Sequence, residues 1–128
     1  MMRLYLVLGM LLLALGAGQL GLRYETLPTR MATHFDLLGN PNGWAPKGRL
    51  FVLHLVVLSA TYVTFAGLLV LSRRGGREYI KVPNRELWLS PPHEGRARRM
   101  IERTIAAIGI ATLLFLLVIF EYVFRANL

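Results

Sequence analysis

The chain has 128 residues, of which 55% are hydrophobic and 17% are charged. This length suits one domain, and the charged fraction lies well below the roughly one quarter that is usual in soluble domains. The absence of cysteine excludes disulfides, thiolate metal sites and thiol nucleophiles. The formal net charge is +8, but most of the positive charge falls in one loop between hydrophobic segments. That placement is typical of a membrane protein and does not favour nucleic-acid binding.

Three hydrophobic runs are long enough to cross a bilayer. They cover residues 3–23, 50–72 and 101–125, and a spanning helix needs about 20 mostly apolar residues. The first run exceeds the roughly 7 to 15 residues of a signal-peptide core, so we expect it to be retained as a span. The sequence therefore predicts an all-α membrane protein with three transmembrane helices. Residues 1–128 are expected to form a single membrane domain.

The two loops between the runs differ in basic residues. Residues 73–103 contain nine Lys and Arg residues, and residues 23–49 contain four. The positive-inside rule therefore predicts a cytoplasmic second loop, a cytoplasmic N-terminus and an extracytoplasmic C-terminus in the cell (inner) membrane. Aromatic residues fit two interfacial belts, with Tyr24, Trp44 and Tyr122 expected at the outer surface and Tyr5, Tyr79 and Trp88 at the inner surface.

Each loop carries local structural signals. The outer loop, residues 24–49, mixes β-forming residues with the turn sequence GNPNGW and predicts a short extracytoplasmic β-hairpin-like unit. In the basic inner loop, residues 73–100, Pro83 interrupts any helix. Ser90 followed by Pro91 then predicts the start of a helix, capped by Ser90, that continues into the third span.

The outer loop resembles the SdpI-type membrane protein family. Its sequence LPTRMATHFDLLGNPNGWAPKGRL, residues 27–50, is similar to the family's LP…HF…G…G…K signature, and the matching positions are Leu27, Pro28, His34, Phe35, Gly39, Gly43, Trp44 and Lys47. The inner-loop stretch VPNRELW resembles the PNREYW element of shorter members, at Pro83, Asn84, Arg85 and Trp88. The chain departs from the pattern at residues 31–32, where a second proline is common, and at Leu87, where an aromatic is usual.

The resemblance implies a function in the membrane. The best-known relatives confer immunity to a secreted toxin and sequester a repressor at the membrane, and they have spans beyond the three found in this sequence. The resemblance thus implies a non-enzymatic sensor, immunity or accessory module that recognises a partner through its outer loop. Two alternatives are a small structural subunit of a larger membrane complex and, with less support, a transport protein or proton relay.

The polar residues of the outer loop do not form a recognisable catalytic or metal-binding pattern. His34 has three interpretations: a metal ligand, a catalytic base, or a brace that hydrogen-bonds the loop backbone. No second ligand at a suitable spacing and no nucleophile accompany it, so we favour the brace and expect no catalytic residue, metal or cofactor. Asp36, Asn40 and Asn42 lack the spacing of a calcium loop and are expected to cap turns. Lys47 is within reach of lipid headgroups or loop carbonyls.

Three polar side chains fall at similar depth in the three spans. Gln19, His54 and Glu121 each lie about one helical turn from the outer end, and ionisable groups at such depth are usually paired. One hypothesis is a hydrogen-bonded cluster of the three, and the alternative is that each extends separately to the interface. Small-residue pairs permit close helix packing within the chain or in a homo-oligomer: Ala14/Gly18, Ala17/Gly21 and Ala107/Ala111. The expected partners are the lipid bilayer and either another protein in the membrane or further copies of the chain in a homo-oligomer, with no nucleic acid.

Overall fold

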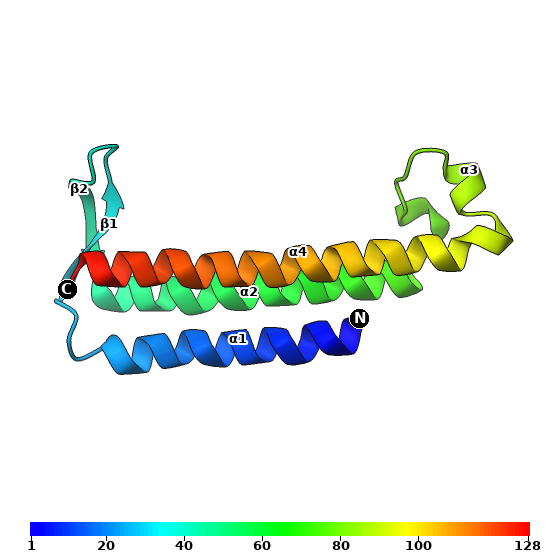
Figure 1. The fold of residues 1–128 in the computed structure, drawn as a ribbon. Coiled ribbons are helices and arrows are strands. Elements are labelled where there is room, and N and C mark those ends of the chain that lie inside the picture. The colour runs from blue at the N-terminus through cyan, green and yellow to red at the C-terminus, as the bar shows by residue number, and fades with distance from the viewer.

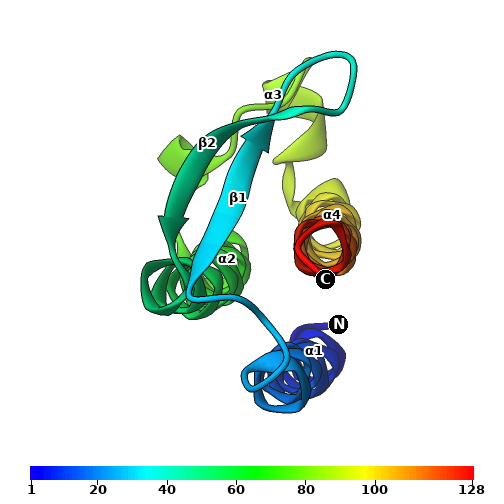
Figure 2. The same ribbon diagram turned by 90° about the vertical axis from the view of Figure 1, so that its left-hand side faces the viewer.

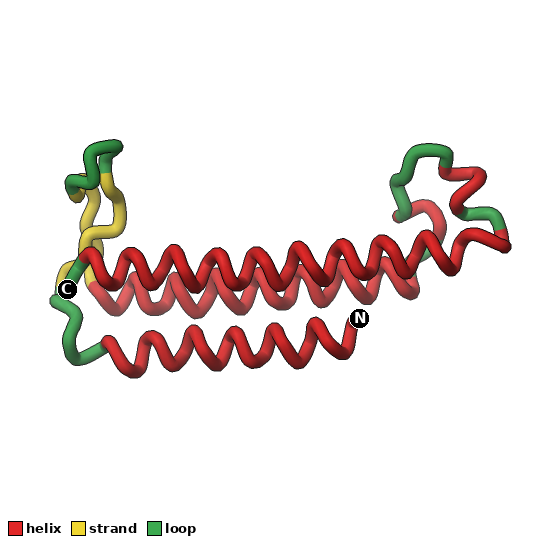
Figure 3. Tube along the Cα trace, viewed as in Figure 1, coloured by secondary structure: helices red, strands yellow, loops and turns green.

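The computed structural model describes residues 1–128 and consists of three long helices side by side, with a small projection at each end (Figure 1). The long helices are α1 (Met2–Arg23), α2 (Lys47–Arg74) and α4 (Pro91–Ala126). Strands β1 (Arg30–Phe35) and β2 (Pro41–Pro46) connect α1 to α2, and a 3-10 turn (Arg77–Tyr79) and the short helix α3 (Arg85–Trp88) connect α2 to α4. Figure 3 shows that the strands are confined to one end. The predicted fold class is confirmed.

All three long helices are long and apolar enough to cross a membrane. Large apolar side chains lie on the exposed faces of these helices as well as between the helices. Examples of exposed ones are Val7 and Leu11 on α1, Val63 on α2 and Phe115 on α4. A helix that is hydrophobic all round has no face to offer water, so a lipid environment explains this surface. We call the two ends of the bundle the hairpin end and the basic end.

The start of α4 follows the predicted signals with one difference. Pro91 occupies the first helical turn and Ser90 is the N-cap residue. The Ser90 carbonyl accepts hydrogen bonds from the N–H groups of His93 and Glu94. The hydroxyl does not cap the helix, because it donates to the carbonyl of Leu87 instead. The predicted side-chain cap is therefore wrong, although the helix boundary is right.

The core is divided along the bundle axis. The largest buried cluster lies at the hairpin end and comprises Leu20, Leu27, Met31, Leu50, Phe51, Phe120 and Phe124. Smaller clusters fill the middle and the basic end. A Cβ built on Gly109 would lie 2.7 Å from Tyr5 Cε2 and 2.8 Å from Phe65 Cγ, so this glycine lets α4 approach both other helices. Gly18 and Gly21 have nothing within 4 Å of such a Cβ, so these two glycines are not used for packing inside the chain.

The hairpin is antiparallel and stands across the direction of the helices (Figures 1 and 2). Its turn is built around Asp36, whose carboxylate accepts from the N–H groups of Leu38 and Asn40 at 2.9 and 2.8 Å. These bonds, led by the one from the Asn40 backbone, hold the pKa of Asp36 below its usual value. Gly39 adopts a positive φ of 84°, which a residue with a side chain rarely adopts.

The basic end is tied together by one buried carboxylate. Glu102 of α4 accepts from the backbone N–H of Met2 at 2.9 Å and from Arg73 Nε at 3.1 Å, so it joins all three long helices. Tyr5, expected in the inner aromatic belt, is instead buried. Its ring stacks on Tyr62 at 5.7 Å and its hydroxyl donates to the Tyr62 carbonyl. The Tyr5 ring therefore packs against α2 near the basic end instead of facing lipid.

Candidate functional site

The hairpin end gathers most of the residues of the outer-loop motif and the intramembrane polar residues. Lys47, the first residue of α2, reaches back to the segment that leaves α1. Its Nζ donates to the carbonyls of Tyr24 and Leu27 at 2.7 and 3.2 Å, and it lies 4.4 Å from the centre of the Tyr24 ring. Lys47 therefore fastens the segment between α1 and β1 to α2. Of the two predicted roles, the structure shows the bonds to loop carbonyls.

The hairpin is also attached to the C-terminal end of α4 through Asn127. The Asn127 side chain accepts from the Ala32 N–H at 2.6 Å and donates to the Ala32 carbonyl at 2.9 Å. The same amide group donates to the Val123 carbonyl at 2.8 Å. The Asn127 side chain thus bonds to the N–H and carbonyl groups of Ala32 as the backbone of a neighbouring strand would. The sequence offers no signal for this contact, because the two residues are 95 positions apart.

The remaining residues of the outer-loop motif shape the hairpin or stay on its surface. His34 is exposed, its Nδ1 lies 3.2 Å from the Thr33 hydroxyl, and its ring packs over Gly43. The expected bond from His34 to the loop backbone is not formed, and the only hydrogen-bond contact of the ring is with the Thr33 hydroxyl. Trp44 and Phe35 remain 55% and 37% exposed. Pro28 precedes β1, in the segment that Lys47 fastens.

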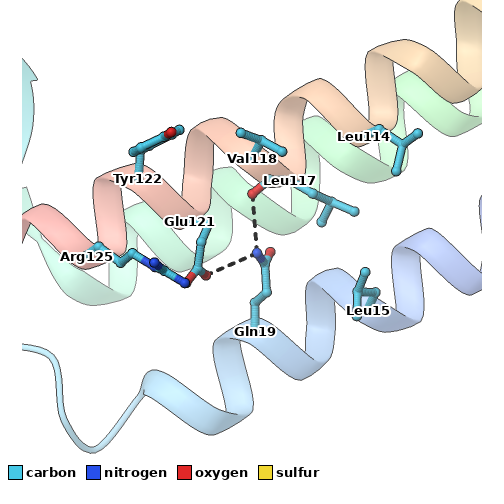
Figure 4. A pocket seen from close by; sticks show the side chains of 8 residues that line it. All are labelled: Leu15, Gln19, Leu114, Leu117, Val118, Glu121, Tyr122 and Arg125. Carbon is cyan, nitrogen blue, oxygen red and sulfur yellow. Dashed lines mark hydrogen bonds and ion pairs between the residues drawn. The ribbon is translucent and has the colours of Figure 1, made fainter.

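Gln19 and Glu121 meet across the interface between α1 and α4 (Figure 4). Gln19 Nε2 donates to a Glu121 carboxylate oxygen at 3.3 Å and to the Leu117 carbonyl at 3.2 Å. Glu121 also pairs with Arg23 of α1 and with Arg125 of its own helix. One carboxylate therefore balances two guanidinium groups. We call Gln19, Arg23, Glu121 and Arg125 the polar network.

His54 does not belong to the polar network. The hypothesis of a hydrogen-bonded cluster of Gln19, His54 and Glu121 is therefore wrong for His54. Its side chain is fully buried, and its Nε2 lies 3.2 Å from the Gly16 carbonyl. Its other ring nitrogen has no hydrogen-bond partner. The ring packs against Phe120 and Phe124, with centroids 4.3 and 5.6 Å away. His54 lies at about the depth that residue counting predicts, but α2 is rotated so that its side chain faces these aromatic rings.

An open groove of about 410 Å³ lies beside the polar network, between α1 and α4 (Figure 4). Its walls are mostly apolar, with Leu15 on α1 and Leu114 and Val118 on α4, and its polar side is formed by Gln19, Glu121 and Arg125. No group of three or more His, Asp or Glu side chains is arranged to hold a metal ion. The four side chains of the polar network form ion pairs and hydrogen bonds with one another.

The inner-loop residues lie at the opposite end of the bundle. Asn84, the N-cap residue of α3, has a positive φ of 52°, and the Arg85 guanidinium donates to the Arg77 carbonyl at 2.7 Å. Pro83, Asn84 and Trp88 line an apolar pocket of about 300 Å³ against the first part of α4. These residues therefore shape the loop between α2 and α4. Most of the length of α4 separates them from the hairpin.

Three apolar helices of spanning length define a multi-pass membrane protein. Residues 9–58 match the family model described as a domain of unknown function (DUF1648). This match covers most of α1, the whole hairpin and the first part of α2, so it includes the hairpin motif and excludes Glu121 and the inner-loop motif. No curated protein and no solved structure matches the chain.

Proposed function

We propose that the chain is a non-enzymatic membrane protein that recognises a protein partner through its hairpin, in the manner of an SdpI-like sensor, immunity or accessory module. The observation that carries this proposal is the way the hairpin is held. Lys47 bonds to carbonyls in the segment between α1 and β1, and Asn127 bonds β1 to the end of α4. Met31 of β1 is buried in the core. Meanwhile Trp44 and Phe35 remain exposed. A rigid element that presents exposed aromatic side chains is suited to recognition, because little ordering is needed on binding.

Two further observations support the proposal. The hairpin motif resembles the SdpI signature, and the residues that match the family model contain the entire hairpin. The basic-residue count predicts that the hairpin lies outside the cytoplasm at the cell membrane, where it would meet a secreted or membrane-bound partner. Enzymatic chemistry has no support, since no nucleophile is paired with a base at this end of the bundle.

Site-specific photocrosslinking in native membranes tests the proposal. A photoreactive amino acid at Trp44 should give a discrete adduct with a protein, and the matched control at Tyr79, which is also exposed but lies at the basic end, should not give it. The same adduct should weaken in a Phe35→Ser background. Absence of an adduct at position 44, or the same adduct from both positions, would contradict recognition by the hairpin. Challenge of a deletion strain with the toxin tests the immunity role separately.

A structural subunit of a larger membrane complex is the second candidate. The specific observation in its favour is the exposed small-residue face of α1, where Gly18 and Gly21 have open space around them. Such a face lets a partner helix approach closely. Substitution of both glycines by leucine should then remove a stoichiometric partner from the purified complex, with Trp44→Ala leaving it in place. The opposite pattern would favour recognition by the hairpin.

A proton relay through Gln19, His54 and Glu121 is not favoured. His54 is bonded to the Gly16 carbonyl and packed between aromatic rings, outside the polar network. A relay needs a continuous chain of proton donors and acceptors, and the hydrogen bonds observed here do not connect these three side chains.

A further inference from the structure

The turn of the hairpin exposes two large apolar side chains. Leu37 and Leu38 are 106% and 88% exposed, and they occupy the two positions after Asp36 in the turn. A turn that faces water is normally occupied by polar residues and glycine. Only Leu22, near the end of α1 in an apolar span, is comparably exposed among the large apolar residues. No other part of the chain covers these two leucine side chains, so an apolar environment for them must come from outside the chain.

We propose that Leu37 and Leu38 insert into the lipid leaflet at the hairpin end, so that the turn of the hairpin is a second, lateral membrane anchor beside the three spans. This proposal does not depend on a protein partner. It concerns the turn, whereas the proposed recognition surface is centred on Trp44 in β2.

The direction of the hairpin supports lipid as the occupant. The hairpin stands across the helix direction (Figure 1), so when the helices span a bilayer it runs along the membrane surface. Its second strand ends at Pro46 and α2 begins at the next residue. The apolar run of α2 begins at Leu50, one helical turn further on. The turn therefore stays near the level of the headgroups, within reach of the acyl-chain boundary.

Four of the five backbone N–H groups of residues 36–40, all except that of Leu37, are already hydrogen-bonded within the turn. The N–H groups of Leu38 and Asn40 donate to the Asp36 carboxylate. The N–H of Gly39 donates to the Asp36 carbonyl at 3.0 Å, and the N–H of Asp36 donates to the Asn40 carbonyl at 2.9 Å. Backbone donors that are already bonded lose little when water is removed from around them. Asp36 and Asn40 also bond through their side chains at 3.2 Å.

The size of the apolar tip argues against a protein as its occupant. A specific protein interface buries roughly 1,200–2,000 Å² in total, and two leucine side chains supply only a small part of that area. Lipid insertion needs no such area, since each buried apolar group contributes by itself. Tyr122 and Leu22 also expose their side chains at this end of the bundle.

Spin-label accessibility tests the proposal on the full chain. The sequence has no cysteine, so single-cysteine variants can be labelled without other changes. Leu37→Cys and Leu38→Cys are labelled in vesicles of phosphatidylethanolamine and phosphatidylglycerol. Leu22→Cys in α1 serves as the lipid reference, and Glu86→Cys in the basic loop serves as the water reference. Collision rates are measured with oxygen, which concentrates in lipid, and with a water-soluble nickel complex.

We expect labels at 37 and 38 to resemble the label at 22, with an oxygen-to-nickel ratio several-fold higher than at 86. A ratio like that at 86 would place the turn in water and overturn the proposal. Protection from both reagents would place it against protein, either a partner or a second copy of the chain, and would also overturn it. Because each variant changes one exposed residue in a turn held by Asp36, the fold is preserved, and a thermal unfolding curve checks this.

Discussion

At the scale of single residues, the contacts of Gly109 show how closely the three helices approach. A Cβ at this position would lie closer than 3 Å to Tyr5 of α1 and to Phe65 of α2. Both neighbours are held in place, because the Tyr5 hydroxyl is bonded to the Tyr62 carbonyl and Phe65 packs in the same cluster. The absence of a side chain at Gly109 is therefore required by tertiary packing, since nothing in the local backbone demands it.

We predict that Gly109→Ala lowers stability by about 1–3 kcal/mol, as expected for overpacking of a filled core. Gly18→Ala is the matched control, because it adds the same methyl group to open space. The control should be neutral or slightly stabilising. Unfolding midpoints of the two variants in the same detergent measure the difference. Equal midpoints would show that α4 moves freely enough to admit a methyl group.

Asp36 gives the turn of the hairpin a defined pH dependence. Hydrogen bonds from Asn40 and Leu38 lower the pKa of this carboxyl in the folded turn. A lowered pKa means that the ionised form stabilises the turn above the unfolded pKa of about 3.9. This stabilisation is lost as the pH falls through the lower, folded pKa.

We therefore predict that the amide signals of Leu38 and Asn40 in NMR spectra shift with a midpoint below pH 3.9, the usual value for aspartate. In the Asp36→Asn variant, which has no titrating group at this position, the same signals should not show this transition. A midpoint at or above the usual value would mean that the carboxylate is not engaged by the turn amides.

At the scale of elements, the hairpin depends on the helices to which it is tied. A two-stranded hairpin is at best marginally stable by itself in water. Here Met31 enters the core at the hairpin end, Asn127 pairs with Ala32, and Lys47 bonds to two carbonyls of the preceding segment. The hairpin is thus held in one conformation by its contacts with the helices. Loss of one of these contacts should make the hairpin more mobile without unfolding the helices.

Lys47→Met tests one of these ties while keeping a long apolar stem. We predict faster proteolysis between residues 24 and 30 and a loss of about 1–2 kcal/mol of stability, since a charged donor to two carbonyls is removed. Arg49→Met removes the same charge from an exposed residue that makes no hydrogen bond, and it should behave like the unchanged chain. Equal cleavage of both variants would indicate that the tie is not needed. Limited proteolysis in detergent and thermal unfolding provide the two readouts.

At the scale of the whole molecule, the polar contacts between helices are concentrated at the two ends of the bundle. Glu102 joins the three helices at the basic end, and the polar network joins α1 to α4 at the hairpin end. Between these polar layers the contacts are almost entirely apolar. Such a distribution places ion pairs near the two membrane surfaces, where the cost of charge is lower than at the bilayer centre.

The distribution of Lys and Arg predicts that the hairpin end faces out of the cytoplasm. Asn42→Cys in β2 should therefore react with a membrane-impermeant maleimide on intact cells. Glu86→Cys in the basic loop should react only after the membrane is opened. Both positions are exposed, so a difference in labelling reports sidedness. The reverse labelling pattern would show that the chain inserts in the opposite orientation.

The sequence by itself determined the elements of this protein. The lengths of the apolar runs set three spanning helices, the turn residues set the hairpin, and Pro91 set the start of α4. These are local properties, because helix length, turn chemistry and proline geometry depend on neighbouring residues. The depths of Gln19 and Glu121 were also readable, since each follows from counting residues along a helix.

Only the tertiary structure decided which side chains meet. Apolar residues surround α1 and α2 on all sides, so the sequence does not distinguish the face that packs from the face that meets lipid. Rotation of the helices about their own axes buries Tyr5, turns His54 away from Glu121 and leaves Gly18 open. The bond between Asn127 and Ala32 has the same origin, because it joins residues 95 positions apart that meet only when the bundle is assembled.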